Sequence, residues 1–363
     1  MIDGSRRRLV MKRIMSDEIA EVLRGELQGG RYRAGDVLPS VDSLRKRFGA
    51  GEFAVRHALQ RLRDERLVAL KQGIGTVATG AALSTWKGRI AFIAVDTSAS
   101  YFRQKLAIQL AKRFRGAGWD FAPIFIEQNK DGLMDVSQIR RSAANGLDFA
   151  ILITDQSQVA EACDSLSIPY VVLNGYMRDF PNARAVIRED FRRCFSELIR
   201  TMRARKVKTL LEFDIERKMD RSFKNQLFES GIAVRRVLCK WQNEKPLYLG
   251  EVKRLGYDAV AGFFADESHR AHLPDAILFD DDYMAEGGIA ALLGCGLRIP
   301  EDVKVVTYSN SGNEPVAGVT LARIDNDPVS YGDTVAEYVL KLLAGRRAAP
   351  PRIFWRFIPG ESL

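Results

Sequence analysis

Residues that could support catalysis or metal binding are few in this chain. It has three histidines, and His269 and His272 stand three residues apart with Pro274 soon after. No third ligand lies near them in the sequence, so the pair does not predict a metal site. The chain has no nucleophile elbow, phosphate-binding loop or strand-linked glycine fingerprint. The sequence therefore predicts a protein that is not an enzyme and needs neither metal nor cofactor.

The cysteines and the apolar segments indicate in which cellular compartment the protein is expected. The four cysteines are far apart and form no Cys-x-x-Cys pair, which indicates reduced thiols rather than disulfides or zinc ligands. The first residues are basic but lack an apolar segment, so they do not predict a secretory signal. No stretch approaches about 18 uncharged apolar residues, the length that a membrane-spanning helix needs. A cytoplasmic protein with no membrane partner is expected.

Positive charge is concentrated near the N-terminus. The chain has 55 Lys and Arg against 46 Asp and Glu, a net charge of +9, and residues 1–80 alone carry +6. A localised positive field suits phosphate binding, because neutralising phosphates releases condensed counterions. The candidate contacts to a nucleic acid are Ser40, Arg45, Lys46, Arg47, Glu52, Phe53, Arg56, His57, Lys71 and Gly73.

Three helices and a β-hairpin are predicted to position these candidates. The expected helices cover about 11–28, 41–48 and 53–66, and the expected strands cover 67–70 and 76–78. Ser40 is a good N-cap for the second helix, and glycines make the turns after that helix and between the strands. This order predicts a winged helix-turn-helix, in which the N-terminus of the third helix enters a major groove.

Beyond a break near residues 78–88, strands alternate with helices. The predicted strands are Ile90–Val95, Phe121–Phe125, Phe149–Ile153, Tyr170–Leu173, Thr209–Phe213, Ala276–Phe279 and Val303–Thr307. The predicted helices cover 103–115, 191–204, 221–230 and 284–294. Such alternation predicts an α/β fold with parallel sheets covered on both faces. The lengths favour two Rossmann-like lobes, with a ligand between them at the carboxyl ends of the strands.

A specific pattern runs through residues 30–77. Its segments are Gly30-x-Tyr32-x-x-Gly35-x-x-Leu38-Pro39-Ser40, Val55-Arg56-x-Ala58-Leu59-x-x-Leu62-x-x-Glu65-x-Leu67-Val68 and Gly73-x-Gly75-Thr76-Val77. This pattern closely resembles the GntR family of winged-helix regulators. The resemblance implies DNA binding, with Arg56 at the position of the family's DNA-contacting arginine. Asp42 and Glu52 depart from the family, because both stand where arginine is common.

A second pattern lies nearer the C-terminus. Its segments are Asp280-Asp281-Asp282-Tyr283-Met284-Ala285 and Gly296-Leu297-Arg298-Ile299-Pro300-Glu301-Asp302-Val303-Lys304-Val305-Val306. From Gly88 onward the chain is similar to the LacI/GalR regulators and to the periplasmic sugar-binding proteins (type I) that share their fold. The whole layout resembles the arabinose-repressor subgroup, in which a GntR-type head is joined to this kind of sensor.

This second resemblance implies a ligand site between the lobes. The loop 96–102 matches a segment that packs an aromatic ring against the ligand, and Arg217 matches an arginine that grips hydroxyls or carboxylates. Trp241 falls near a stacking aromatic, and Asp281 falls at a position that usually faces the cleft. The candidate ligand-binding residues are Asp96, Ser98, Tyr101, Phe102, Asn174, Arg188, Arg217, Trp241, Asp281, Ser309 and Asp325.

One of these positions departs from the LacI/GalR pattern. Ser309 stands where that family often has an aspartate that binds sugar hydroxyls, and Asp325 on a later strand could compensate. Arg188 and Arg217 together would suit an acid or a phosphate. An alternative interpretation is a sensor that has lost its ligand and serves only as a dimerisation scaffold.

Together with the resemblances, the sequence predicts a transcription repressor. Residues 1–77 are expected to be the DNA-binding winged helix, residues 78–88 a linker, and residues 89–363 the ligand-binding and dimerisation domain. A homodimer would bind double-stranded operator DNA, under the control of a small effector that is a sugar or sugar derivative. The lobes are expected to close about strands near residues 188–190, Tyr308 and residues 324–326.

Overall fold

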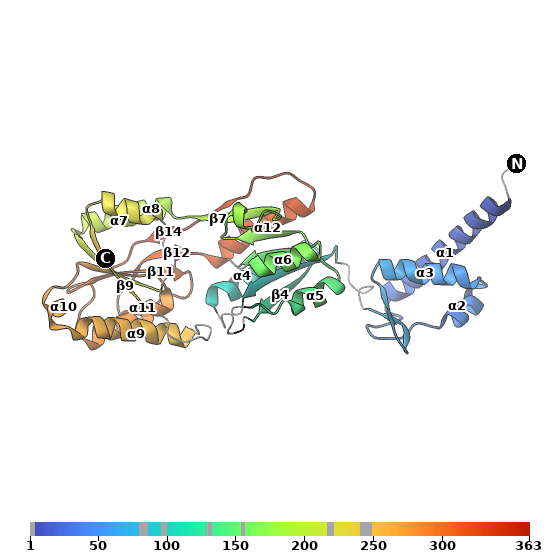
Figure 1. The fold of residues 1–363 in the computed structure, drawn as a ribbon, viewed down its shortest axis with the longest axis horizontal. Helices are drawn as coiled ribbons and strands as arrows, with labels where there is room; N and C mark the ends of the chain where they lie inside the picture. Colours follow the sequence, from blue (N-terminus) through green and yellow to red (C-terminus); the bar gives the residue numbers. More distant parts are fainter. Residues whose placement is uncertain are drawn as a thin grey trace. The chain divides into compact units, whose positions relative to one another are not determined.

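The chain divides into two compact units, Met1–Lys87 and Gly88–Leu363 (Figure 1). The structure is a computed structural model that describes residues 4–79, 86–95, 100–127, 129, 133–153, 157–215, 221–239 and 249–363. Within these ranges, no helix combines the length and the apolar character needed to cross a membrane.

The N-terminal unit has the predicted winged helix-turn-helix fold. Its elements are α1 (Gly4–Gln28), α2 (Val41–Phe48), α3 (Glu52–Asp64) and the antiparallel strands β1 (Val68–Lys71) and β2 (Gly75–Ala78). Ser40 caps α2, because its side-chain oxygen accepts a hydrogen bond from the Ser43 backbone N–H at 3.2 Å. Gly49 ends α2 in the left-handed conformation, with φ of 59°, and so sets the turn into α3.

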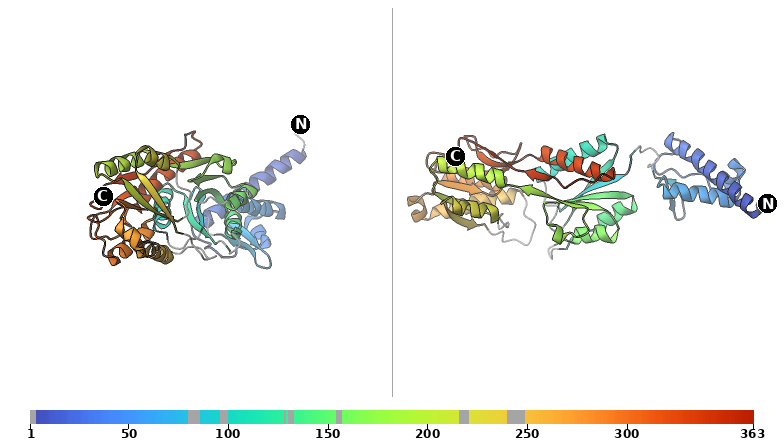
Figure 2. Two further views of the ribbon diagram at one scale, coloured as in Figure 1. Left: turned by 60° about the vertical axis from the view of Figure 1, so that its left-hand side comes forward. Right: turned by 90° about the horizontal axis from the view of Figure 1, so that it is seen from above.

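The C-terminal unit contains two six-stranded sheets, and each sheet forms the centre of one lobe (Figures 1 and 2). The order in lobe 1 is β13-β7-β6-β5-β3-β4, and the order in lobe 2 is β14-β12-β11-β10-β8-β9. Every pairing is parallel except that of β12 with β14. The strands of lobe 1 are β3 (Arg89–Val95), β4 (Asp120–Ile126), β5 (Leu147–Ile153), β6 (Tyr170–Leu173), β7 (Ala185–Asp190) and β13 (Arg352–Phe354). Those of lobe 2 are β8 (Thr209–Asp214), β9 (Ala233–Leu238), β10 (Ala276–Phe279), β11 (Lys304–Asn310), β12 (Ala322–Asn326) and β14 (Arg356–Ile358).

Helices cover both faces of each sheet, as the alternation of strands and helices predicted. In lobe 1 they are α4 (Tyr101–Gly116) and α12 (Pro328–Leu343) on one face, and α5 (Ser137–Ala144) and α6 (Ser157–Ser165) on the other. In lobe 2 they are α7 (Arg192–Ala204) and α8 (Arg221–Glu229) on one face, and α9 (Leu249–Ala265) and α11 (Asp282–Gly294) on the other. The described residues of this unit also form a 3₁₀ turn at Met177–Asp179 and the short helix α10 (Glu267–Ala271).

The chain passes between the lobes at three places. It leaves lobe 1 between β7 and α7, returns between β12 and α12, and leaves again at Trp355 between β13 and β14. The prediction of hinges near residues 188–190 and 324–326 therefore matches two of these links. The prediction at Tyr308 is wrong, because β11 pairs on both sides with strands of lobe 2. Tyr308 instead packs its ring against Trp355, with the ring centroids 6.0 Å apart.

Candidate functional site

The N-terminal part of α3 is an exposed part of the predicted DNA-reading surface. Phe53 is 64% exposed and lies beside the ring of His57, at 6.0 Å between centroids. The Arg56 side chain is 67% exposed, and its Nε donates a hydrogen bond to Glu52 Oε1 at 2.7 Å. Behind them, Val55 and Leu62 are fully buried, so α3 is held firmly while its polar face stays open. Four predicted residues, Glu52, Phe53, Arg56 and His57, are thus brought together on the first two turns of α3.

The basic cluster of α2 is partly engaged within the unit. Arg47 binds Glu26 of α1 through both terminal nitrogens, and this guanidinium holds the pKa of the Glu26 carboxyl below its usual value. Arg45 donates to Asp42 at 3.3 Å, whereas Lys46 is exposed. Arg47 therefore ties α2 to α1, and Arg45 and Lys46 stand nearer to the solvent than Arg47 does.

The hairpin ends in a tight, exposed tip. Lys71 closes β1, and Gly73 and Gly75 have φ values of 77° and 113°, which glycine adopts without a steric cost. Ile74 between them is 58% exposed. A tip built in this way lets the backbone approach another molecule closely. Ser40, another predicted contact, has its hydroxyl engaged in capping α2.

Four of the predicted ligand-binding residues lie outside the described residues: Asp96, Ser98, Arg217 and Trp241. Tyr101, which begins α4 in lobe 1, makes a direct contact with lobe 2. Its hydroxyl donates to the Ser311 backbone oxygen at 3.1 Å, and its backbone N–H donates to the Tyr283 hydroxyl at 3.2 Å. Gly312 leaves room for this ring, because a Cβ there would lie 2.2 Å from the Tyr101 hydroxyl oxygen. Tyr101 therefore bridges the two lobes.

Removal of the Tyr101 hydroxyl is expected to loosen this bridge. Tyr101→Phe deletes one hydrogen bond between the lobes, worth about 1 kcal/mol. Backbone hydrogen exchange in the peptide containing Gly312 should therefore become about fivefold faster. Tyr257→Phe is the matched control, since Tyr257 is 42% exposed on α9 and should leave that exchange rate unchanged. Equal exchange in wild type and Tyr101→Phe would contradict the bridge.

Phe102, the next predicted ligand contact, packs within lobe 1. Its ring meets the edge of Tyr331 of α12 at 5.3 Å between centroids, and it lies against the buried cluster beneath α4 and α12. Asn174 directly follows β6 and has a positive φ of 59°. Its backbone N–H donates to the Ile187 oxygen and so extends the pairing of β6 with β7. Arg188 is exposed, and its guanidinium lies 4.9 Å from the centre of the Tyr176 ring. Tyr176 was not foreseen from the sequence.

In lobe 2, two neighbouring aspartates have different roles. Asp281 caps α11, because its carboxylate accepts from the backbone N–H groups of Tyr283 and Met284 at 2.9 and 3.2 Å. Asp282 is only 3% exposed, and burial raises the pKa of its carboxyl. It accepts from the side-chain amides of Asn310 and Asn313 at 3.1 and 3.0 Å. This Asp282–Asn310–Asn313 cluster was not predicted from the sequence, where its signal was polar residues at or just beyond the ends of two strands.

Ser309 and Asp325 are neighbours across the β11–β12 pairing. Asp325 is 1% exposed and accepts hydrogen bonds from Ser311 at 2.6 Å and from Arg356 at 3.1 Å. Arg323 lies 3.4 Å away, so the carboxylate is already bound by residues of lobe 2. Ser309 is 2% exposed, and its hydroxyl oxygen has no hydrogen-bond partner within the described residues. The Asp325 carboxylate therefore balances the positive charges of Arg323 and Arg356 in its own lobe.

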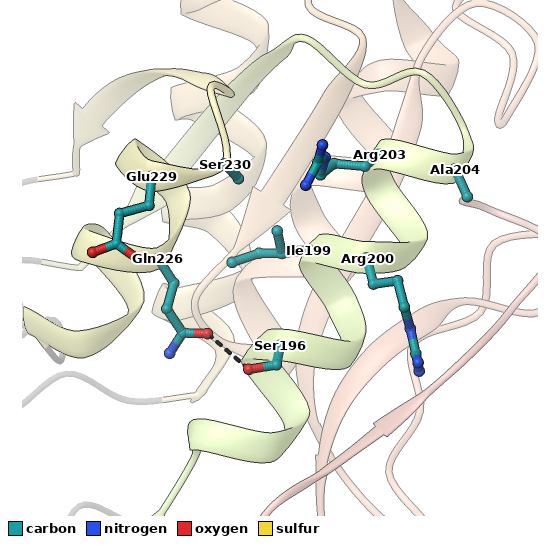
Figure 3. A pocket seen from close by; sticks show the side chains of 8 residues that line it. All are labelled: Ser196, Ile199, Arg200, Arg203, Ala204, Gln226, Glu229 and Ser230. Carbon is teal, nitrogen blue, oxygen red and sulfur yellow. Dashed lines mark hydrogen bonds between the residues drawn. The ribbon is translucent and has the colours of Figure 1, made fainter.

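A groove of about 740 Å³ lies between α7 and α8, on the face of the lobe 2 sheet that these helices cover (Figure 3). Its lining residues are Ser196, Ile199, Arg200, Arg203, Ala204, Gln226, Glu229 and Ser230. Ser196 and Gln226 hydrogen-bond to each other at 3.0 Å across it. The groove contains none of the predicted ligand-binding residues, and its mixed, solvated charges single out no ligand. Within the described ranges, no three His, Cys, Asp or Glu side chains are arranged to hold a metal ion.

Models of two families match the chain. Residues 15–77 match "Bacterial regulatory proteins, gntR family", and residues 203–363 match "Periplasmic binding protein-like domain". Residues 15–77 are thus similar to the gntR family and residues 203–363 to a periplasmic binding protein-like domain, which confirms both resemblances seen in the sequence.

A curated relative and several solved structures are similar to parts of this chain. The chain is 31% identical over 98 residues to the HTH-type transcriptional repressor PurR of Escherichia fergusonii, covering 27% of this chain and 28% of that protein. It therefore spans little more than a quarter of the length of that relative.

A LacI family transcriptional regulator from Bifidobacterium animalis has a TM-score of 0.61 at 17% identity, covering 76% of this chain and 97% of the other. A LacI family regulator from Arthrobacter sp. FB24 in complex with lactose has a TM-score of 0.60 at 19% identity, covering 76% and 99%. The lac repressor dimer bound to operator and an anti-inducer has a TM-score of 0.59 at 14% identity, covering 76% and 93%. These structures show that the two-lobed fold is shared.

Proposed function

We propose that this chain is a DNA-binding transcription repressor whose affinity for operator DNA is controlled by a small effector. The observation that carries the proposal is the N-terminal turn of α3, which presents Phe53 and Arg56 on a firmly packed helix beside an exposed wing. An exposed helix terminus of this kind fits a major groove, and the glycine-rich tip of the hairpin fits a neighbouring minor groove. The matched repressors and the lac repressor–operator complex support the same role.

The salt dependence of DNA binding tests this proposal. The full chain should bind a duplex, and the logarithm of its affinity should fall linearly with the logarithm of salt concentration because phosphate contacts release counterions. Fluorescence anisotropy on labelled duplexes, starting from DNA that the protein itself selects from random sequences, would measure it. If the chain shows no salt-sensitive affinity for any duplex, the proposal is wrong.

A homodimer is part of the proposed mechanism. Two winged helices would bind an inverted repeat whose half-sites lie about one helical turn apart. The effector would bind between the lobes and change their relative orientation, which alters the spacing of the two heads. This role requires no bond to be made or broken, and we therefore propose that the chain is not an enzyme.

The effector is proposed to be a sugar or sugar derivative. A sensor that only holds two heads together is the second candidate, and the observation behind it is Ser309 in the place of a sugar-binding acid, beside an Asp325 already bound by Arg356 and Ser311. A thermal-shift screen with pooled sugars, sugar acids and sugar phosphates separates the two, because a ligand that binds the native state raises its melting temperature. Stabilisation by one pool supports a working sensor, and none from any pool supports the scaffold.

A further inference from the structure

The N-terminal end of α3 carries an acid as well as bases. Glu52 is the first residue of α3, and Arg56 lies one turn further along the same face of the helix. The Arg56 Nε donates a hydrogen bond to Glu52 Oε1 at 2.7 Å. The other carboxylate oxygen of Glu52 lies 4.0 Å from a terminal nitrogen of Arg45 in α2. Both oxygens of Glu52 thus face arginines of the predicted DNA-reading surface.

Arg45 is shared between two acids. Its terminal nitrogen also donates to Asp42 at 3.3 Å, so charge alternates from α2 to α3 along Asp42, Arg45, Glu52 and Arg56. The four formal charges cancel, and the exposed fractions of the four side chains lie between 43% and 81%. A surface that bound DNA by phosphate attraction alone would keep its cations unpaired. This network therefore adds little net attraction for phosphates, although it is open to a partner.

The hydrogen bond to Glu52 fixes which edge of the Arg56 guanidinium is presented. The Nε is occupied, and the two terminal nitrogens have no hydrogen-bond partner within the described residues. These two nitrogens form a planar fork that can donate two parallel hydrogen bonds. Because Glu52 restricts the arginine before DNA arrives, less conformational freedom is lost when the fork binds.

A guanine edge and a phosphate both offer two acceptors to such a fork. In the major groove guanine presents O6 and N7 side by side, whereas adenine and thymine each present a single acceptor and cytosine presents a donor. A phosphate on Arg56 would come close to the Glu52 carboxylate and be repelled by its charge, but a base edge has no formal charge. The acid beside Arg56 therefore favours guanine over a phosphate.

We propose that Glu52 is a positioning residue that makes Arg56 selective for guanine in the operator half-site. Glu52 acts through Arg56 and reads no base itself. Its negative charge weakens the binding of every duplex, and the orientation that it gives Arg56 restores affinity only where a guanine meets the fork. Specificity is such a difference between two affinities. This inference rests on the proposed DNA-binding function and adds the base that the operator must contain.

Paired duplexes test the inference in the full chain at one salt concentration. One is the duplex that the wild type selects from random sequences, and in the others each G·C pair in turn is replaced by A·T. One replacement should weaken binding of the wild type by about 10- to 100-fold and leave the affinity of Arg56→Ala unchanged. The ratio of the two wild-type affinities at that pair is the guanine preference. If no such pair exists, Arg56 binds a phosphate and the inference is wrong.

Glu52→Ala should lower the guanine preference about fivefold or more, because Arg56 loses the hydrogen bond that orients it. It should bind the A·T duplex at least as tightly as the wild type does, since an anion has been removed from beside the phosphates. Damage to the fold would instead weaken both duplexes and lower the melting temperature. Asp64→Ala is the matched control, because it removes the same charge from the exposed last residue of α3 and should leave the preference unchanged.

A double variant shows whether Glu52 acts through Arg56. In the Arg56→Ala background, Glu52→Ala should change the affinity for both duplexes by the same factor, because the group that Glu52 orients is absent. A preference at another base pair that is lost with Glu52, whether or not Arg56 is present, would show that Glu52 reads a base itself and would overturn the inference.

The wild type separates failure of this inference from failure of the proposed function. A wild type that binds no duplex contradicts both. A wild type that selects a duplex, but whose guanine preference is the same in Glu52→Ala, contradicts the positioning role of Glu52 and leaves the DNA-binding function standing.

Discussion

Gly256→Ala is expected to destabilise the C-terminal unit by about 3 kcal/mol. Helices α9 and α11 touch backbone to backbone, and a Cβ at Gly256 would lie 2.2 Å from the Met284 carbonyl oxygen of α11. The reverse contact is as close, since a Cβ at Gly287 would lie 1.8 Å from the Lys253 oxygen of α9. A backbone cannot move aside as a side chain can, so the two helices must separate. Urea unfolding followed by circular dichroism would show a lower midpoint.

The same helix supplies the control. Gly262 lies six residues further along α9, and a Cβ there would have no atom within 4 Å. Gly262→Ala should therefore stabilise the protein by up to about 1 kcal/mol, because alanine favours a helix more than glycine does. Similar effects of the two substitutions would mean that α9 and α11 are not packed as described.

Arg56→Ala is expected to weaken binding to the preferred duplex by about 10- to 100-fold. The Arg56 Nε is held by Glu52, which leaves the two terminal nitrogens of the guanidinium available for a base edge or a phosphate. Loss of one such contact to a base costs about 1–3 kcal/mol. Anisotropy titrations at fixed salt, with the duplex selected by the wild type, would measure the loss.

A substitution on the same helix separates this effect from a general loss of charge. Arg63 is exposed in the last turn of α3, away from the N-terminal turn. Arg63→Ala removes the same charge and should weaken binding only slightly. Binding of any effector found by the thermal-shift screen should be unchanged in Arg56→Ala. If Arg63→Ala costs as much as Arg56→Ala, the assignment of α3 as the reading helix is wrong.

Local signals were sufficient for much of the fold. Ser40 indicated the start of α2 because a capping interaction needs only neighbouring residues. The seven predicted strands are all present, because buried parallel strands are continuous apolar runs. The strand β9 was missed since it is an edge strand that contains Arg235 and Arg236 and has exposed positions. The helix α9 was missed because its three glycines suggested loops, whereas Gly256 serves the close contact with α11.

The sensor residues were harder to predict. Asp281 and Asp282 are adjacent and chemically identical, and only the fold decides that the first caps a helix and the second is buried against two asparagines. Asp325 looked like a possible replacement for the acid missing at Ser309, but its partner Arg356 comes from a strand too short to recognise.

The route of the chain through the two lobes constrains how the protein can be assembled during synthesis. Lobe 1 is completed by α12 and β13, and lobe 2 by β14, so both need residues beyond 350. The winged helix uses contiguous residues and can fold as soon as they leave the ribosome. The two lobes must instead wait for the same late segment, and during that interval the exposed edges of β7 and β12 could pair with other chains. Expression at lower temperature, or with chaperones, should therefore improve the yield of the sensor more than that of the head.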